Sequence, residues 1–492
     1  MRGPLGRFAA LLLALLLASC QTPRQEQVVF AIATAPASLH PLLATDAVSE
    51  RINELLYRPL IEFDERNRPV PGIVQWHMRD PRHYELRLMT NLAPFSPGSE
   101  VRLDDVHATL LGARDHPASP HAGTLANLRE VKTHQEYLLL VLEEPDPRFP
   151  EKLHLGVAPA ALLDDPSRLA REPVGNGPFE LLYWLKDGGV LLQRRRDGQR
   201  FAFQVVPDPT MRALKLLRGE ASLVQNDLPY EMYPVLESEL EIELQSTPGT
   251  TFSYLGFNLE DPVTGDRRIR AAIAHAIDRR AIVEHLFSGY ALRTNTLLTA
   301  QHWAAHQRLV PYAHDPERAR ALLAEMGYSR SQPLHLSYKT STDPFRLRVA
   351  AVLQAQLKEV GINLKISSNE WGTFFGDIKA GRFQMYSLSW VGIRTTDIFR
   401  HVFHSDSLPP GGANRGRYQS QEVDRLIDQA SLLKKEAAKP LYRSLQEIIH
   451  RDLVYVPLWH EDNLLLSRGI QDSTPQRDGS YRFLEQVSLR NE

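Results

Sequence analysis

Two pairs of histidines come nearest, in residue type and spacing, to metal chemistry. His302 and His306 are four residues apart in HWAAH, the spacing that puts two zinc ligands on one helix face, but the glutamate of H-E-x-x-H is missing. His401 and His404 are three residues apart in HVFH. Because the chain has 18 histidines, such pairs arise readily by chance. We therefore predict no metal site and no cofactor.

Nucleophilic catalysis has no better support in the sequence. A hydrolase needs a nucleophile beside a general base, and the sequence contains no G-x-S-x-G motif. The DGG at 187–189 is typical of a turn rather than of a phosphate-binding loop, and no pair of acidic residues stands out as catalytic. We predict that the protein is not an enzyme and has no catalytic residue, with a surface hydrolase as the less favoured alternative.

The only cysteine, Cys20, directly follows an apolar run at the N-terminus. After Arg2 and Arg7 come roughly a dozen uncharged residues, a length typical of a signal-peptide core and short of the ~20 residues that span a bilayer. The letters LASC that end at Cys20 resemble the lipobox of bacterial lipoproteins. That resemblance implies that residues 1–19 are removed and that the thiol is acylated, and several acyl chains make a stable membrane anchor.

The lipobox resemblance also implies a location. It puts the mature chain in the periplasm or on the extracytoplasmic face, held at the cell membrane or the outer membrane through lipidated Cys20. Residues 20–27 are polar and would form a short tether. An exported chain with no second cysteine cannot form an internal disulfide, and acylation would consume a thiol that is otherwise a liability.

Length and charge limit the domain count and the partners. A chain of 492 residues implies more than one core, because single cores stop growing near ~250–300 residues. The sequence has 57 Lys and Arg against 59 Asp and Glu. Loss of residues 1–19 removes two arginines and no acid, which takes the net charge from −2 to −4. This balance lacks the polybasic pattern of nucleic-acid binding, so we expect no nucleic-acid partner.

The clearest secondary-structure pattern lies between residues 333 and 392. Alternating apolar residues predict strands, and a helix between the first two begins at Asp343 with Pro344 in its first turn and ends at Gly361. The succession reads strand 333–341, helix 344–360, strand 362–368, helix 371–381 and strand 382–390. Such a β-α-β-α-β order with short connections predicts a mainly parallel sheet covered by helices.

The remainder of the chain divides into two kinds of pattern. Further helices are predicted at 315–328, 420–436 and 437–452, followed by a strand at 453–459, which extends the α/β part. The first 250 residues instead hold short strands such as YELRLM, EYLLLVLEE and FELLYWL between proline-rich turns. We expect α+β structure with antiparallel pairing there.

Several segments resemble a known family. These are PVGNGPFELLYW (173–184), the long stretch FSYLGFNLEDPVTGDRRIRAAIAHAIDRRAIVEHLFSGYA (252–291) and the C-terminal helix pair and strand (418–459). They are similar to the bacterial extracellular solute-binding proteins of family 5, the oligopeptide and dipeptide receptors of ABC importers. Residues 37–63 match the family's opening and 95–106 match its next element more loosely, so the resemblance covers nearly the whole mature chain.

The resemblance implies an α/β fold of the type II periplasmic-binding-protein kind, with two lobes and an extra α+β subdomain in lobe one. The chain would leave lobe one near residues 254–258 and return near 459–463. The predicted ranges are therefore 28–254 for the first part of lobe one, with the subdomain at about 48–170, then 255–460 for lobe two and 461–492 for the return segment. Within 266–287, Asp278 is expected to cap the second of two helices.

The resemblance also points to the ligand site, with one departure from the family pattern. Peptide-binding members carry a Trp-x-x-Asp element whose acid pairs with the peptide amino terminus, and here Trp390 is present but Ile393 replaces the acid. An enclosed ammonium costs several kcal/mol unless it is paired, so a free dipeptide is disfavoured. An anionic or neutral ligand on Arg394, or a longer peptide held through its backbone, fits better. Metal chelates, haem and oligosaccharides stay open.

Six residues are the candidate ligand contacts. Thr340 lies where dipeptide receptors place a base, and Asp397 is the first acid after Ile393. Trp390 could stack on a ligand or serve packing, and Arg394 could be a cleft residue at the end of a strand or an ordinary surface arginine. The full predicted set is Ser38, Tyr254, Thr340, Trp390, Arg394 and Asp397.

We interpret the sequence as that of a lipid-anchored receptor of an ABC importer. It would be a monomer that captures a peptide or other small solute between its lobes, closes by hinge motion and delivers the solute to permease subunits. The alternative from another class, besides a hydrolase, is a ligand-sensing adaptor on the same fold that does not support uptake.

Overall fold

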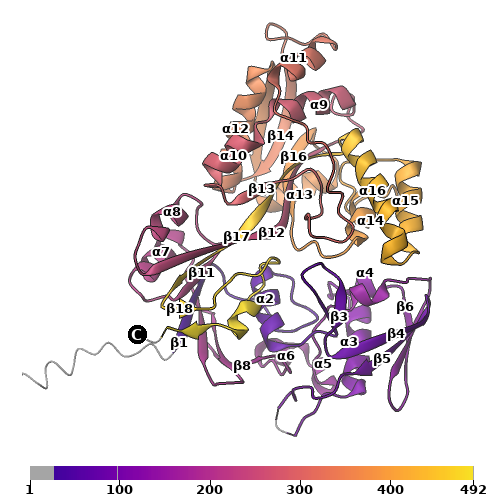
Figure 1. Ribbon diagram of the computed structural model, residues 1–492, viewed down its shortest axis with the longest axis vertical. Helices are drawn as coiled ribbons and strands as arrows, with labels where there is room; N and C mark the ends of the chain where they lie inside the picture. The colour runs from indigo at the N-terminus through magenta and orange to yellow at the C-terminus, as the bar shows by residue number, and fades with distance from the viewer. Residues whose placement is uncertain (1–26, 97, 491–492) are drawn as a thin grey trace, which may run out of the picture.

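Two long antiparallel strands run through the molecule and connect its two lobes (Figure 1). They are β12 (Ile242–Phe257) and β17 (Tyr455–Arg468), paired from Ile242 with Arg468 to Gly256 with Tyr455. The computed structural model describes residues 27–96 and 98–490. Cys20, the predicted signal peptide and nearly all of the predicted tether lie outside these residues. Among the described helices, none combines the length and apolarity needed to cross a bilayer.

Lobe two, as the name is used here, holds the elements between β12 and β17. Its strands β14 (Leu334–Ser341), β15 (Ile362–Asn369) and β16 (Met385–Trp390) are mutually parallel. The predicted β-α-β-α-β order and the parallel arrangement of its three strands are confirmed. The sheet as a whole is mixed, because β16 pairs antiparallel with β12, and β12 pairs antiparallel with β17. Crossover helices keep the first three strands parallel, whereas β12 and β17 enter and leave the lobe in opposite directions.

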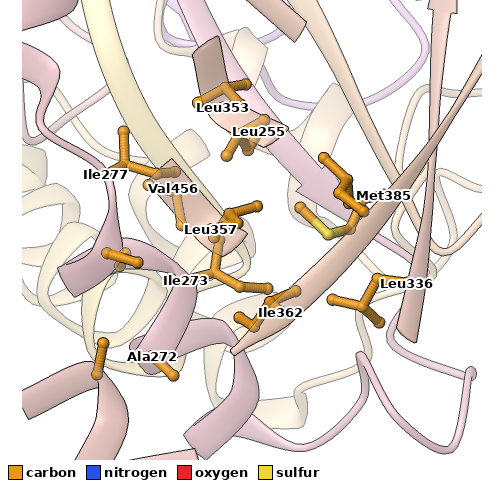
Figure 2. Close-up of a cluster of buried hydrophobic side chains, with 14 of the residues drawn as sticks. Leu255, Ala272, Ile273, Ile277, Leu336, Leu353, Leu357, Ile362, Met385 and Val456 are labelled. Carbon is orange, nitrogen blue, oxygen red and sulfur yellow. The ribbon is translucent and has the colours of Figure 1, made fainter. Parts of the chain in front are cut away.

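Helices cover this sheet and supply its core. Leu255 of β12 and Val456 of β17 lie with Ile273, Leu353 and Leu357 in one buried cluster (Figure 2). The helices are α9 (Arg267–Ala276), α10 (Arg279–Leu286), α11 (Pro316–Ala324), α12 (Pro344–Glu359), α13 (Trp371–Lys379), α14 (Asp397–Phe403), α15 (Gln421–Ser431) and α16 (Lys435–Asp452), with the short strand β13 (Ala291–Arg293) beside β17.

The helix starts predicted from the sequence are confirmed. Asp343 accepts a hydrogen bond from the backbone N–H of Arg346 at the start of α12, and Asp278 accepts one from Ala281 at the start of α10. These bonds satisfy backbone donors that have no partner within the helix. After α12, Gly361 has φ +93°, a conformation that glycine adopts without strain, and the chain turns there into β15.

Lobe one continues the same sheet on the other side of β17. The strand order from β17 is β11 (Leu223–Gln225), β1 (Gln27–Ile32), β10 (Arg200–Val205), β9 (Val190–Arg194) and β8 (Phe179–Trp184). The covering elements are α2 (Ala47–Leu56), α5 (Ala160–Leu163), α6 (Pro166–Arg171), α7 (Pro209–Leu217), α8 (Met232–Glu237), the 3₁₀ helix η2 (Arg482–Glu485) and the strands β18 (Ile470–Gln471) and β19 (Ser488–Leu489).

A separate α+β unit belongs to lobe one. Its sheet has the order β4 (Val74–Asp80), β5 (His83–Leu88), β7 (Leu138–Leu142) and β6 (Leu128–Thr133), with every neighbouring pair antiparallel. It has its own buried cluster drawn from residues 42–157. The other elements are β2 (Ile61–Phe63), β3 (Pro69–Pro71), α3 (Leu103–Asp115), α4 (Ala122–Leu125) and the 3₁₀ helix η1 (Phe149–Lys152). The antiparallel pairing expected in the first 250 residues is confirmed, and the exact domain ranges stay predictions.

Candidate ligand-binding site

Two cavities lie where elements of the two lobes face each other. The first, the α2 cavity, has a volume of about 510 Å³ and is lined by residues of α2, the loop after β16 and the return segment, among them Glu54, Arg394 and Asp478. The second, the β17 cavity, has about 480 Å³ and lies between the segment 209–230 and lobe two. Cavities of this size are typical of sites for small molecules.

Arg394 lies in the α2 cavity, but its charge is already paired within the protein. Its Nη2 atom is 3.1 Å from Oε1 of Glu54 and 3.1 Å from Oδ2 of Asp478, both in lobe one. Burial lowers the pKa of Arg394, and the charges of Glu54 and Asp478 outweigh it and raise that pKa. An anionic ligand on Arg394 would therefore have to displace or join two carboxylates. That Arg394 contacts the ligand stays a prediction.

The acids beside Arg394 leave hydrogen-bonding capacity facing the same region. Oε2 of Glu54 and Oδ1 of the buried Asn53 have no hydrogen-bond partner among the described residues. His154 lies 3.7 Å from Oε1 of Glu54. Burial raises the pKa of Glu54, but the bonds and charges of His154 and Arg394 bring it down to about 2. The α2 cavity is thus lined by an ionised carboxylate, Glu54, that is held between His154 and Arg394.

Tyr254 and Trp390 are packed together inside lobe two. Tyr254 is fully buried and its ring centroid is 3.9 Å from that of Tyr455 and 6.5 Å from that of Trp390. Arg415 lies over the Trp390 ring at 4.4 Å and donates a hydrogen bond to the Tyr254 hydroxyl at 3.1 Å. Neither aromatic residue lines the α2 cavity or the β17 cavity. Of the two interpretations of Trp390, these contacts favour packing.

The other three predicted ligand-contact residues lie at separate places in or near the interface between the lobes. Thr340 is 1% exposed near the end of β14 and lines neither cavity. Ser38 lies in the turn before α2, where its hydroxyl accepts a hydrogen bond from the backbone of His40 at 3.2 Å. Asp397 begins α14, and its carboxylate is 3.9 Å from both Arg148 and Lys152 of lobe one. The structure therefore does not bring the six residues together in one site.

The sequence did not single out the acids that line the two cavities. Glu50 and Glu54 lie one turn apart on α2, and Glu461 lies in β17 between the apolar runs 455–459 and 464–466. A charged residue between two apolar runs of one strand can be noticed in the sequence, because burying a charge without a partner costs free energy. Asp478 has no comparable local signal.

The histidine pairs have ordinary partners within the protein. His302 Nε2 lies 3.2 Å from the carbonyl oxygen of Arg394, and His306 Nε2 lies 2.7 Å from a carboxylate oxygen of Glu447. His404 lies 3.4 Å from Asp428. Within residues 27–96 and 98–490, no group of three or more His, Cys, Asp or Glu side chains is arranged to hold a metal ion.

Comparison with known proteins identifies the family. The profile of the bacterial extracellular solute-binding proteins, family 5 (middle region), matches residues 38–405. The chain belongs to this family. As a family 5 solute-binding protein it is 27% identical over 458 residues to the probable di/tripeptide-binding protein 5 of Pseudomonas aeruginosa, covering 84% of this chain and 86% of the relative.

Two further comparisons extend the likeness to a second relative and to a solved structure. The heme-binding protein A of Haemophilus influenzae is 23% identical over 477 residues, covering 88% of this chain and 86% of that protein. The crystal structure of the ABC transporter substrate-binding protein CtaP from Listeria monocytogenes superposes with a TM-score of 0.83 at 20% identity, over 94% of this chain and 99% of CtaP. This structural likeness confirms the predicted type II periplasmic-binding-protein fold.

Proposed function

We propose that this family 5 protein is a lipid-anchored receptor of an ABC importer, which captures a peptide or other small solute between its lobes and delivers it to permease subunits. The observation that carries the proposal is the position of the two cavities, each lined by residues of both lobes. A ligand held there contacts both lobes at once, so its binding free energy favours the closed form.

Charged contacts between the lobes support the closing step. Besides the Arg394 pairs, Lys435 of α16 lies 3.3 Å from Glu151 of η1, and Arg348 of α12 lies 2.9 Å from Glu231 next to α8. Arg148 of lobe one also donates a hydrogen bond to the Thr396 hydroxyl of lobe two. These contacts exist only when the lobes are together. They lower the free energy of the closed form that a permease would recognise.

The ligand class follows from the cavities and from the relatives. One relative is named for di- and tripeptides and another for heme, and two cavities of about 510 and 480 Å³ provide room for a solute of that size range. Ile393 cannot pair with an amino terminus at the Trp-x-x-Asp position, which argues against a free dipeptide bound in the usual orientation. The protein would act as a monomer, and lipidated Cys20 would hold it at the extracytoplasmic surface.

A ligand screen tests the proposal. The full chain, purified in detergent, is examined by thermal shift against peptides, metal chelates, haem and oligosaccharides. A true ligand at a hundredfold excess over Kd stabilises the folded form by about 2.7 kcal/mol, and small-angle scattering should show a more compact protein. A bound solute that is recovered chemically altered, or a library without any stabilising member, contradicts the proposal.

Uptake is tested in cells. Deletion of the gene should abolish import of the solute that the screen identifies, and re-expression should restore it. A Cys20→Ala variant should leave solute binding unchanged but should appear in the soluble fraction rather than in the membrane fraction. If the deletion strain imports the solute at the normal rate, the protein is not its transport receptor.

A further inference from the structure

The β17 cavity has a continuous aromatic wall. The Tyr230 ring lies 4.8 Å from Phe287 and 5.2 Å from Phe345, measured between ring centroids. Phe287 in turn lies 4.9 Å from Phe345 and 4.9 Å from Trp459. All four rings line the cavity. Such a wall offers apolar area and π faces, which bind hydrocarbon and also attract cations.

The carboxylate of Glu461 lies against this wall without a basic partner. Its Oε1 atom accepts a hydrogen bond from the Ser253 hydroxyl at 2.8 Å, and Ser389 lies 2.7 Å from Ser253 on the neighbouring strand. No Lys, Arg or His of the described chain lies within ion-pair distance of Glu461. Glu461 lines both the β17 cavity and a smaller adjoining cavity of about 90 Å³.

Other charged groups of the cavity do not neutralise Glu461. Burial raises its pKa, and the Ser253 hydrogen bond and the more distant Arg346 lower it only in part. Arg348 is paired with Glu231. Arg212 donates to the backbone carbonyls of residues 206, 207 and 227. Asp227 also lines the cavity, where burial raises its pKa and the charge of Arg212 lowers it in part.

Trp459 is the second feature of this wall, because it has an unpaired hydrogen-bond donor. This residue is 2% exposed and lines the cavity, yet its Nε1–H has no acceptor among the described residues. Buried donors nearly always have a partner, and an unpaired one costs about 1–3 kcal/mol. A ligand that brings a hydrogen-bond acceptor close to its positive charge would satisfy both Trp459 and Glu461.

We propose that Glu461 binds a cationic group of the transported solute, a primary ammonium or a guanidinium, while Ser253 orients the carboxylate and the aromatic wall holds the adjoining apolar part. This inference rests on the proposed function and specifies its ligand class. Glu461 provides the negative charge that Ile393 does not provide, from a different wall of the cleft. The α2 cavity is a weaker candidate for a cation because Arg394 already pairs with its acids.

A matched pair of probes tests the assignment. Trileucine amide carries one ammonium and no carboxylate, and N-acetyl-trileucine amide has neither charge. Isothermal titration calorimetry on the full chain in detergent should give at least about tenfold tighter binding for the charged probe, the size expected for a hydrogen bond to a charged group. Glu461→Gln should reduce this ratio to near one, and Ser253→Ala should reduce it in part.

Glu243→Gln is the control, because it removes an acid from β12 whose partner is Arg490, away from the cavity. It should keep the full preference for the charged probe. Thermal melting shows whether each variant is folded, and Ser253→Ala provides a second variant if Glu461→Gln is not. Equal affinity for the two probes, absence of binding of the charged probe, or an unchanged ratio in Glu461→Gln overturns the inference. The proposed function survives those results as long as some solute of the broad screen binds.

Discussion

The guanidinium of Arg394 and the carboxylate of Glu54 lie 3.1 Å apart, although 340 residues separate them in the chain. Arg394 follows β16 in lobe two and Glu54 lies on α2 in lobe one. Asp478 makes a third member at 3.1 Å. The three charges come from both lobes, and about a quarter of each side chain is exposed. The cluster is therefore a contact between the lobes that remains accessible to water.

Removal of the arginine should favour the open form. In Arg394→Ala, Glu54 and Asp478 would face each other without a cation, and we expect a loss of about 1–3 kcal/mol in the free energy of unfolding, less than for a fully buried pair. Small-angle scattering should show a larger radius of gyration without ligand. The double variant Arg394→Ala with Glu54→Gln should recover part of the loss. An Arg394→Ala protein as stable and compact as the original would show that the cluster does not hold the lobes.

The same cluster should be sensitive to acid. The pKa of Glu54 is depressed from 4.5 to about 2, so its contribution to stability is fully present above pH 4.5 and is lost as the pH falls from there to 2. Between pH 6 and pH 3, the loss in the free energy of unfolding should be on the order of 2 kcal/mol. Denaturant titrations at pH 6 and pH 3 measure it, and Glu54→Gln should show a correspondingly smaller difference. An equal difference in the variant would assign the acid sensitivity to other groups.

His302 should add a second dependence at higher pH. Burial lowers its pKa from 6.5 to about 4. Between these two pH values His302 is therefore mostly neutral in the folded protein and mostly protonated in the unfolded chain. Stability should therefore be highest above pH 6.5 and fall as the pH decreases from 6.5 to 4. His302→Gln should flatten this part of the curve. The exposed His134 serves as the control in His134→Gln.

An acid introduced at the family position 393 should destabilise the protein rather than create a second site for an amino group. Ile393 is 8% exposed and packs in a hydrophobic cluster of lobe two. Ile393→Asp should therefore destabilise the protein by about 2–4 kcal/mol, because it removes apolar contacts and buries a carboxyl. Val391→Asp is the control, since Val391 is 67% exposed and lines the α2 cavity. Thermal melting should give a lower melting temperature for Ile393→Asp than for Val391→Asp. A stable Ile393→Asp that gains dipeptide affinity would contradict this expectation.

Local sequence patterns determined much of the fold of this protein. The Asp-Pro starts and glycine ends of helices such as α12, the alternation of β14 and the order of elements from 333 to 392 follow from backbone capping and from the burial period of each element. The family resemblance added the two-lobe plan. These features are local or are repeated across the family, and each can be recognised without knowledge of distant contacts.

Only the tertiary structure decided which residues line the cavities between the lobes. Tyr254 and Thr340 are buried in lobe two, Arg394 is paired with Glu54 and Asp478, and Glu461 is left without a basic partner. The direction of β12 and β17, which makes the sheet mixed, was also decided there. The physical reason is that burial periodicity shows which side of an element is covered, whereas the pairing of charges depends on how two lobes, distant in sequence, come together.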